Sequence, residues 1–276
     1  MEESTNASAS TSTSTDTTRT HTVSVGALEV PVRYTDGAAL ACIYRVPLDA
    51  ARAVLESECF EPLPVGGRAL VQVMALEYRE TSVGPYNELG VLVLARRTGS
   101  TPSAVRAVMK TEAVRDAGWF VVNLPVTTGL SCAAGRELWG FPKYVTRLDT
   151  KFDRQTVQII LGEELVIEHR VRFGIPMPCP PYVFFSELDG RLLRTVVPVE
   201  HKLHMGGARS VRVHITGDGP TSATVRTLGL DRRRPMFAFR AEPLRFSLPL
   251  GVAVGSTPIR IGSTEDVPSS PDAPPP

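Results

Sequence analysis

Hydrophobic and polar side chains alternate along much of the chain, in short runs with a period of two. Val211, Val213 and Ile215, for example, are separated by single polar residues. Successive side chains of a β-strand point to opposite faces, so this pattern predicts strands with one face turned toward a core. The apolar run 118–126, GWFVVNLPV, predicts a further, buried strand.

Pairs of these runs are separated by residues that form tight turns, as in β-hairpins. One turn is Asp189-Gly190, another is Gly-Glu-Glu at 162–164, and a third is expected in Gly-Asp-Gly-Pro at 217–220. Hairpins join antiparallel neighbours, so most strands should pair antiparallel. The strands expected beside the first two turns are 182–188, 191–197, 157–161 and 165–173.

Helical patterns are fewer. Residues 47–57 are amphipathic, and 129–138 can form a short helix, whereas 103–117 fit neither period clearly. The sum predicts a mainly β (α+β) fold: an antiparallel, closed or nearly closed β-barrel with a few peripheral helices.

The two ends of the chain differ from the part between them. Residues 1–22 are rich in Ser and Thr and nearly free of large apolar side chains, and 259–276 are rich in Pro and polar residues. Such segments bury too little apolar surface to offset the entropy lost on ordering. We therefore expect two disordered tails around one folded domain, residues 23–258.

Charge and cysteine spacing argue against several classes of function. The formal net charge is +1, so there is no basic excess for binding nucleic acid. No run of roughly 18 apolar residues predicts a membrane helix, and the first residues lack the apolar core of a signal peptide. The cysteines at 42, 59, 132 and 179 have no CxxC spacing. We expect a cytoplasmic protein with reduced thiols and no membrane or nucleic-acid partner.

One of the four lysines, Lys143, follows aromatic residues and a proline in ELWGFPKYV, residues 137–145. An amine must lose its proton before it attacks a carbonyl, and burial in apolar surroundings disfavours the ammonium form. Trp139, Phe141 and Pro142 supply apolar surface and a fixed backbone. The stretch is compatible with a buried, reactive lysine, but the residues alone favour the alternative, an exposed lysine whose stem lies over the rings.

The same stretch resembles the signature of the acetoacetate decarboxylase family, which is GRE followed by an aromatic residue, proline and lysine. Here it reads GRELWGFPK, residues 135–143. The resemblance covers most of 30–250 and implies the family's cone-like β-barrel and a homo-oligomer. The other similar stretches are LVQVMALEYRE (70–80), PYNELG (85–90), PYVFFSELDGRLLRTVV (181–197) and GPTSATVRTLGL (219–230).

The resemblance also implies roles for single residues. In the family, the lysine after the proline forms a Schiff base with the substrate, and Lys143 matches it. Glu88 matches an acidic residue that faces this amine and handles protons. Gln72 stands where the decarboxylases have a second glutamate, and Tyr144 replaces a second lysine. Gly37 replaces a substrate-facing arginine.

These departures change the expected electrostatics of the pocket. Losing a neighbouring lysine removes a like charge that favours a neutral Lys143, whereas Gln72 removes a negative charge that favours the ammonium. Tyr144 offers a phenol as hydrogen-bond donor if it faces the pocket. Losing the arginine weakens the grip on a substrate carboxylate and with it the β-keto acid assignment. Three arginines are possible substitutes: Arg33, Arg45 and Arg79.

Schiff-base chemistry at Lys143 requires neither a metal nor an organic cofactor, and it takes a small oxo acid as substrate. A protonated imine next to a β-carboxylate releases carbon dioxide, so the first expected function is a lyase that decarboxylates a β-keto acid such as acetoacetate. If the enamine attacks an aldehyde instead, the protein is an aldolase-dehydratase acting on pyruvate or another oxo acid. The third alternative is a non-catalytic barrel that binds an apolar ligand.

Other chemically suggestive residues have simpler explanations. His201 and His204 have helical spacing for a metal site, but no third ligand stands nearby, so a surface pair is expected. Glu137 of the GRE signature is expected to be structural, beside Arg136. Cys132 has no histidine partner in view, which favours packing over nucleophilic catalysis.

Overall fold

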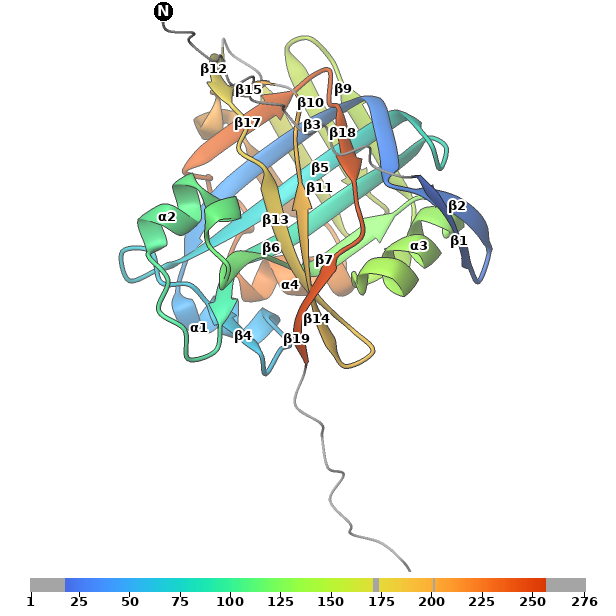
Figure 1. The fold of residues 1–276 in the computed structure, drawn as a ribbon. Coiled ribbons are helices and arrows are strands. Elements are labelled where there is room, and N and C mark those ends of the chain that lie inside the picture. Colours follow the sequence, from blue (N-terminus) through green and yellow to red (C-terminus); the bar gives the residue numbers. More distant parts are fainter. Residues whose placement is uncertain (1–17, 171–173, 201, 257–276) are drawn as a thin grey trace, which may run out of the picture.

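Most of the described chain is β structure (Figure 1). The structure, a computed structural model, describes residues 18–170, 174–200 and 202–256. The helices are α1 (Leu48–Val54), α2 (Ala104–Met109), α3 (Gly129–Trp139) and α4 (Pro220–Thr227), with 3₁₀ turns η1 (Thr111–Ala113) and η2 (Ala208–Ser210). The strands are β1 (Arg19–Val23), β2 (Gly26–Val30), β3 (Val32–Val46), β4 (Phe60–Pro62), β5 (Ala69–Thr81), β6 (Tyr86–Arg97), β7 (Ala117–Val126), β8 (Lys143–Val145), β9 (Leu148–Phe152), β10 (Thr156–Leu161), β11 (Leu165–Arg170), β12 (Ile175–Pro178), β13 (Tyr182–Leu188), β14 (Arg191–Val197), β15 (Lys202–Met205), β16 (Arg212–Ile215), β17 (Phe237–Ala241), β18 (Phe246–Leu248) and β19 (Val252–Ser256).

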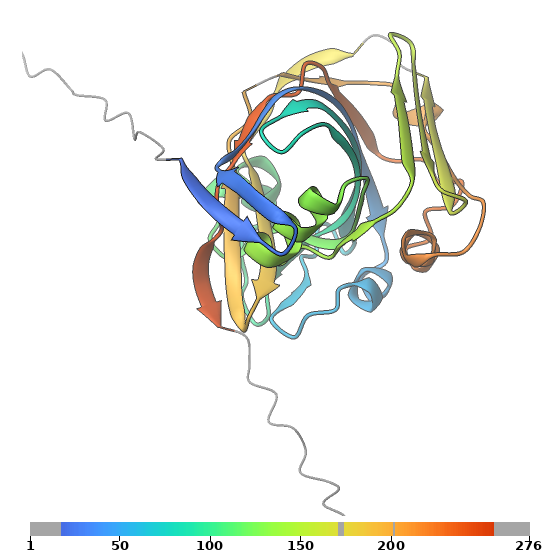
Figure 2. The ribbon, with the colours of Figure 1, turned by 90° about the vertical axis from the view of Figure 1, so that its right-hand side faces the viewer.

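One large sheet forms the body of the molecule. Its strand order is β12-β15-β17-β3-β5-β6-β7-β13-β14-β19, with β18 paired to β3, β4 to β6 and β8 to β7. Neighbours are antiparallel except that β13 and β8 run parallel to β7. The long strands β3, β5 and β6 curve strongly, and α3 and the β1–β2 hairpin lie across one end of the curved sheet (Figure 2).

The barrel was predicted to be closed or nearly closed; within the described residues, no continuous ladder closes the sheet. The edge of β14 is occupied by β19, and Pro198, which follows β14, has no N–H to extend a ladder. Beyond it a single isolated bridge joins Val199 to Phe246 of β18. The mainly β, largely antiparallel character is as predicted.

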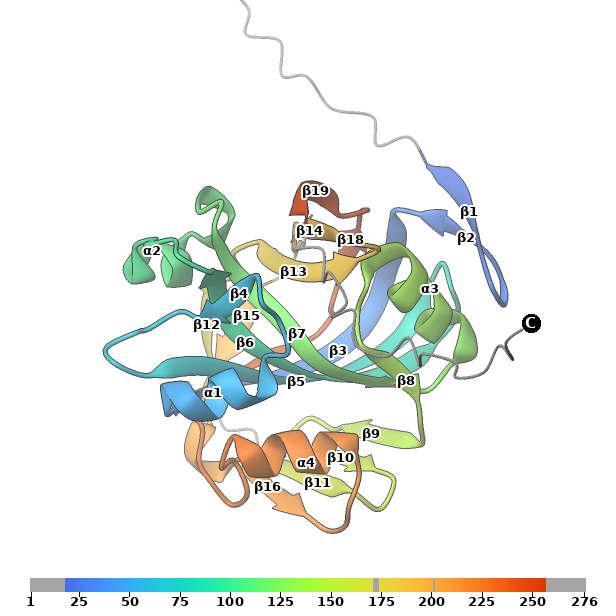
Figure 3. The same ribbon diagram turned by 90° about the horizontal axis from the view of Figure 1, so that it is seen from below.

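A smaller sheet, in the order β16-β11-β10-β9, packs with α4 against the outer face of the large sheet (Figure 3). One apolar core lies between the two sheets and includes Val73 of β5 and Ile159 of β10. A second core lies on the other face of the large sheet and includes Leu76 of β5. Strand β5 is therefore buried on both faces, and its even-numbered residues face the interior that contains the site.

Most of the predicted elements are confirmed. The hairpins at 162–164 and Asp189-Gly190 join β10 to β11 and β13 to β14. The predicted helices correspond to α1 and α3, and the ambiguous segment 103–117 contains α2 and η1. Residues 19–22, assigned to a tail, belong to β1, and residues 1–17 and 257–276 lie outside the described residues. Within the described part of the chain, no helix is long and apolar enough to cross a membrane.

Candidate active site

Helix α3 and the turn after it place Lys143 at the start of β8. Thr128 caps the helix by accepting a hydrogen bond from the Ser131 amide, and Gly140 ends it in the left-handed region at φ 66°. A side chain at Gly140 would lie 2.2 Å from the Glu187 carbonyl oxygen, so both the conformation and the space require glycine. Lys143 then pairs in register with Leu124 of β7.

The glycine of the GRE signature makes room for the lysine stem. A Cβ atom at Gly135 would lie 2.4 Å from Cδ and 2.6 Å from Cε of Lys143. The stem of Lys143 therefore lies directly on the helix backbone, in space that any other residue at position 135 would fill. This contact limits the directions in which the amine can point.

The amine of Lys143 meets the carboxylate of Glu88 in a buried ion pair. Nζ lies 2.7 Å from Oε2, and the two side chains are 7% and 9% exposed. Glu88 comes from β6, 55 residues earlier in the chain. The structure thus brings together the two residues that the resemblance assigns to the chemistry.

Three buried tyrosines surround Glu88. The hydroxyl of Tyr78 makes a long, 3.5 Å contact with Oε1 of Glu88, and the hydroxyls of Tyr34 and Tyr86 are 2.8 Å apart. The ring of Tyr86 lies 5.5 Å from Nζ of Lys143. Burial, and then the nearby charges and phenols, raise the pKa of all three tyrosines, so the phenols stay protonated and can donate hydrogen bonds.

These three tyrosines were not predicted from the sequence. They come from β3, β5 and β6, and nothing in the local sequence shows that they converge on Glu88. A partial signal exists for Tyr78, which has the same parity along 69–81 as Gln72 and so should face the same side of the sheet.

Lys143 and Glu88 open onto an apolar cavity inside the curved sheet. The cavity holds about 90 Å³ of space for the centres of water-sized molecules, enough for several waters or one small organic molecule. Its walls come from the inward-facing residues of β3, β5, β6, β7, β13 and β17 and from the segment around β18, and Phe141 is one of them.

Two residues predicted for the pocket are on the cavity's margin or behind it. Gln72 is buried and donates through Nε2 to the hydroxyl of Tyr182, which does line the cavity, at 2.9 Å. Burial raises the pKa of Tyr182 to about 12. Trp139 is buried behind the wall and donates from Nε1 to the Pro249 carbonyl at 2.8 Å.

Tyr144, also predicted for the pocket, points away from it. Successive residues of β8 face opposite sides, so Lys143 and Tyr144 cannot both face the cavity. The hydroxyl of Tyr144 lies 2.6 Å from Oγ1 of Thr221 on α4. Thr221 in turn donates to Oδ1 of Asn123. The phenol that replaces a second lysine therefore belongs to the contact between α4 and the large sheet.

The missing arginine at position 37 has a backbone explanation. The register between β3 and β5 is irregular on both sides of Asp36, next to Gly37. A Cβ atom at Gly37 would lie 2.5 Å from the carbonyl oxygen of Glu77. This backbone accepts glycine and excludes an arginine.

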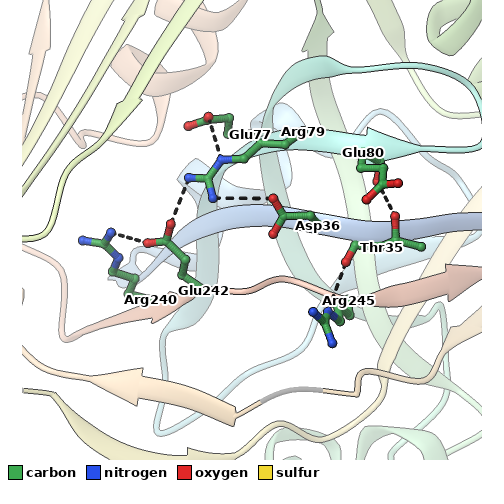
Figure 4. A network of polar contacts seen from close by, with 8 residues as sticks. All are labelled: Thr35, Asp36, Glu77, Arg79, Glu80, Arg240, Glu242 and Arg245. Atoms are coloured by element: carbon green, nitrogen blue, oxygen red, sulfur yellow. Dashed lines mark hydrogen bonds and ion pairs between the residues drawn. The ribbon is translucent and has the colours of Figure 1, made fainter.

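None of the three arginines considered as substitutes reaches the cavity. Arg33 pairs with Glu29 at 3.2 Å on the surface, and Arg45 donates to the carbonyl of Gly66. Arg79 belongs to a polar network outside the cavity wall (Figure 4).

That network links β3, β5 and β17 on one face of the large sheet. Arg79 pairs with Glu77 at 3.0 Å, with Glu242 at 2.9 Å and with Asp36 at 3.8 Å, and Arg240 pairs with Glu242 (Figure 4). The side chains of Arg79 and Arg240 are thus held by acids.

The remaining residues that the sequence singled out lie outside the described cavity lining. Glu137 accepts hydrogen bonds from the amide and hydroxyl of Ser24 and so ties the β1–β2 turn to α3. Cys132 is a free, partly buried thiol. His204 is exposed on β15, and His201 lies outside the described residues. Within the described ranges, no group of three or more His, Cys, Asp or Glu side chains could hold a metal ion.

Comparison with known proteins places the sequence signature in a family. The family model described as acetoacetate decarboxylase matches residues 17–169, which contain both Glu88 and Lys143. No curated protein matches the sequence significantly.

Solved structures of similar fold have low sequence identity. Acetoacetate decarboxylase from Legionella pneumophila is 16% identical with a TM-score of 0.61, covering 82% of this chain and 88% of its own. The enduracididine biosynthesis enzyme MppR, complexed with the condensation product of pyruvate and imidazole 4-carboxaldehyde, is 14% identical with a TM-score of 0.53, covering 82% and 89%. An acetoacetate decarboxylase-like enzyme from Sphingomonas wittichii is 14% identical with a TM-score of 0.52, covering 80% and 92%. At these identities the likeness establishes the fold.

Proposed function

Because this chain belongs to the acetoacetate decarboxylase family, we propose that it is a carbon–carbon lyase that forms a Schiff base through Lys143 and decarboxylates a β-keto acid. The observation that carries the proposal is the buried contact of 2.7 Å between Nζ of Lys143 and Oε2 of Glu88, at the wall of an apolar cavity. An amine and a proton-handling group within hydrogen-bond reach are what imine formation needs.

The pair supplies a neutral amine by moving one proton. Transfer from the ammonium of Lys143 to the carboxylate of Glu88 leaves an amine beside a carboxylic acid, with no net change in charge. Apolar surroundings penalise two separated charges, so they favour this neutral arrangement more than water does. The amine then adds to the substrate ketone. The acid of Glu88 protonates the departing hydroxyl, which leaves as water and yields a protonated imine.

The apolar cavity also favours the loss of carbon dioxide. The protonated imine is positive and the β-carboxylate is negative. When the bond between the α-carbon and the carboxylate breaks, its electrons form the enamine, and both charges disappear. Surroundings of low dielectric favour a step that removes charge. A proton from solvent, delivered through Glu88, then reaches the enamine carbon, and hydrolysis frees the ketone and Lys143.

The second candidate is an aldolase-dehydratase, since MppR has the same fold and its structure holds a condensation product of pyruvate. Pyruvate keeps its carboxylate through the whole reaction, so that group needs a lasting cationic partner. The described cavity lining contains no arginine, and its lysine is used for the imine. This observation favours the decarboxylase over a pyruvate aldolase. Glycine in place of an arginine at position 37 weakens the hold on a β-keto acid's carboxylate as well, but that carboxylate leaves as carbon dioxide, whereas the carboxylate of pyruvate stays. The third reading, a ligand barrel without chemistry, leaves the Lys143–Glu88 pair unexplained.

Borohydride trapping tests the proposal. The protein is incubated with acetoacetate, reduced with sodium borohydride, digested, and weighed by mass spectrometry. We expect a reduced adduct on Lys143, none in the Lys143→Arg variant, and undiminished trapping in Lys151→Arg, which changes an exposed lysine in the same way. Absence of an adduct with acetoacetate, longer β-keto acids and pyruvate would contradict Schiff-base chemistry.

Product analysis separates the two lyases. A decarboxylase releases carbon dioxide and a ketone from a β-keto acid alone, whereas an aldolase-dehydratase forms a condensation product only when an aldehyde is added to an oxo acid. We further propose a homo-oligomer, as the family resemblance implies, which light scattering coupled to size-exclusion chromatography measures directly.

A further inference from the structure

The charged groups of the described cavity lining neutralise each other. They are Lys143 and Glu88, paired at 2.7 Å. The other polar atoms of this lining are phenol hydroxyls, those of Tyr34, Tyr78 and Tyr182, and burial raises the pKa of each, so they stay uncharged. The rest of the described wall is Ala, Val, Leu, Met and Phe. A substrate therefore meets hydrocarbon everywhere except at the Lys143–Glu88 pair and the phenols.

The nearby arginines cannot turn into this space. Along β5, Leu76 and Tyr78 line the cavity, so the intervening Glu77 and the following Arg79 face the other side. Along β17, Phe239 lines the cavity and Arg240 faces away, into the network of Figure 4. The alternation of the strands thus keeps the cations and their acids outside.

We propose that the substrate carries a hydrophobic substituent on its keto group: a β-keto acid with an alkyl or aryl chain in preference to acetoacetate. The inference rests on the proposed function and adds the substrate class. The keto carbon lies at Lys143, and the chain lies along the wall that includes Met74, Leu92 and Phe184. A second charged group on the substrate has no partner there and is excluded.

The register of β3 and β5 gives the alkyl chain of the substrate a direction. Ala39 faces Leu76, the partner of Glu88, while Ala41 faces Met74, one inward-facing position further from Glu88. Both alanines line the cavity, and their small side chains leave space on that wall. Each methylene buried there is expected to raise kcat/KM about fourfold until the space is filled.

The test measures carbon dioxide release from 3-oxobutanoate, 3-oxohexanoate and 3-oxooctanoate by the full chain. We expect kcat/KM to rise by at least tenfold from the first substrate to the better of the other two. If 3-oxobutanoate is the best substrate, or the series is flat, the substrate class is wrong while the decarboxylase proposal stands. If no member releases carbon dioxide or traps Lys143, both proposals fail.

A binding measurement that needs no turnover supports or overturns the cavity argument separately. Acetone, 2-pentanone and 2-heptanone are added at equal concentration, and the thermal unfolding midpoint is recorded. A ligand that binds the native state raises the midpoint according to its affinity, so the midpoint should increase with chain length. Equal shifts for the three ketones would contradict a hydrophobic chain site.

A variant that fills part of the cavity tests where the alkyl chain of the substrate lies. Ala41→Leu should lower kcat/KM for 3-oxooctanoate at least tenfold more than it lowers kcat/KM for 3-oxobutanoate, because the longer chain occupies the space that the new side chain fills. Ala223→Leu makes the same change on the exposed face of α4 and should change neither value. Equal losses for both substrates in Ala41→Leu, in a protein that unfolds at the normal temperature, would overturn the assigned direction.

Discussion

Substituting Gly135 by alanine should displace the amine of Lys143, which we propose to be the reacting group. The new Cβ atom would lie 2.4 Å from Cδ of Lys143, about 1 Å closer than ordinary van der Waals contact allows. The helix backbone cannot give way, because Gly135 is the seventh of the eleven residues in α3 and its carbonyl accepts a hydrogen bond from the Phe141 amide. The lysine stem must therefore move, and Nζ leaves its position at Glu88.

The size of the effect follows from this displacement. Misplacing a reacting group by about 1 Å costs on the order of 10²-fold in rate, so kcat for carbon dioxide release and the rate of borohydride trapping should both fall by about that factor. Stability should change far less. Overpacking costs about 1–3 kcal/mol, while alanine gains about 1 kcal/mol over glycine inside a helix.

Gly129→Ala is the matched control, since it makes the same substitution at the start of the same helix, where no atom apart from the chain neighbours and the helix's own backbone lies within 4 Å of the new Cβ. Its trapping rate and turnover should equal those of the native protein. The assay follows the mass of the reduced adduct against time, together with urea unfolding of each variant. Unchanged trapping in Gly135→Ala, or an equal loss in Gly129→Ala, would refute the idea that Gly135 positions the lysine.

Three further predictions follow from contacts in the structure. Glu88→Gln keeps the shape of the site but removes the proton carrier, so kcat should fall about 10²–10⁴-fold, and a smaller loss contradicts its proton role. Tyr144→Phe should leave kcat within twofold and cost about 1 kcal/mol in urea unfolding, since its hydroxyl contacts α4; a large loss of kcat would place the phenol in the reaction. Burial, and then the charge of Arg240, lower the pKa of His169 to about 4, so the unfolded state binds more protons below about pH 6.5, and the native protein loses about 2 kcal/mol between pH 7 and pH 5. His169→Gln should remove that part of the pH dependence, whereas exposed His204→Gln should retain it.

The strands and their hairpins could be read from the sequence because alternation and turn residues are local signals. The burial of Lys143 could not be read from the preceding Trp-Gly-Phe-Pro run alone, because an exposed lysine whose stem lies over the rings fits the same residues; the resemblance to the family favoured the buried position. The partner of the lysine was not readable from spacing: Glu88 lies on a strand 55 residues earlier, and its assignment came from resemblance. Strand pairing over such distances depends on the register of the whole sheet.

The orientation of residues on β5 shows a second limit of prediction from the sequence. Residues 69–81 are buried on both faces, so hydrophobic side chains occupy odd and even positions alike, and alternation cannot tell the cavity face from the face toward the smaller sheet. Alternation therefore could not predict that Gln72 bonds to Tyr182, that the tyrosines lie together near Glu88, or that Arg79 lies outside the cavity. For Tyr144 the alternation on β8 would have sufficed, because a cavity-facing Lys143 turns its neighbour away.

The signature GRELWGFPK acts as one positioning unit. Gly135 leaves room for the lysine stem, Glu137 ties the helix to the β1–β2 turn, and Gly140 ends the helix against the backbone of β13 so that Lys143 starts β8. The cavity walls come largely from other strands, above all β3, β5, β13 and β17. Amine placement and substrate shape thus depend on separate parts of the chain. The signature carries the proposal of Schiff-base chemistry, whereas the proposed substrate class depends on the described wall residues, which are apolar and lack a second cation.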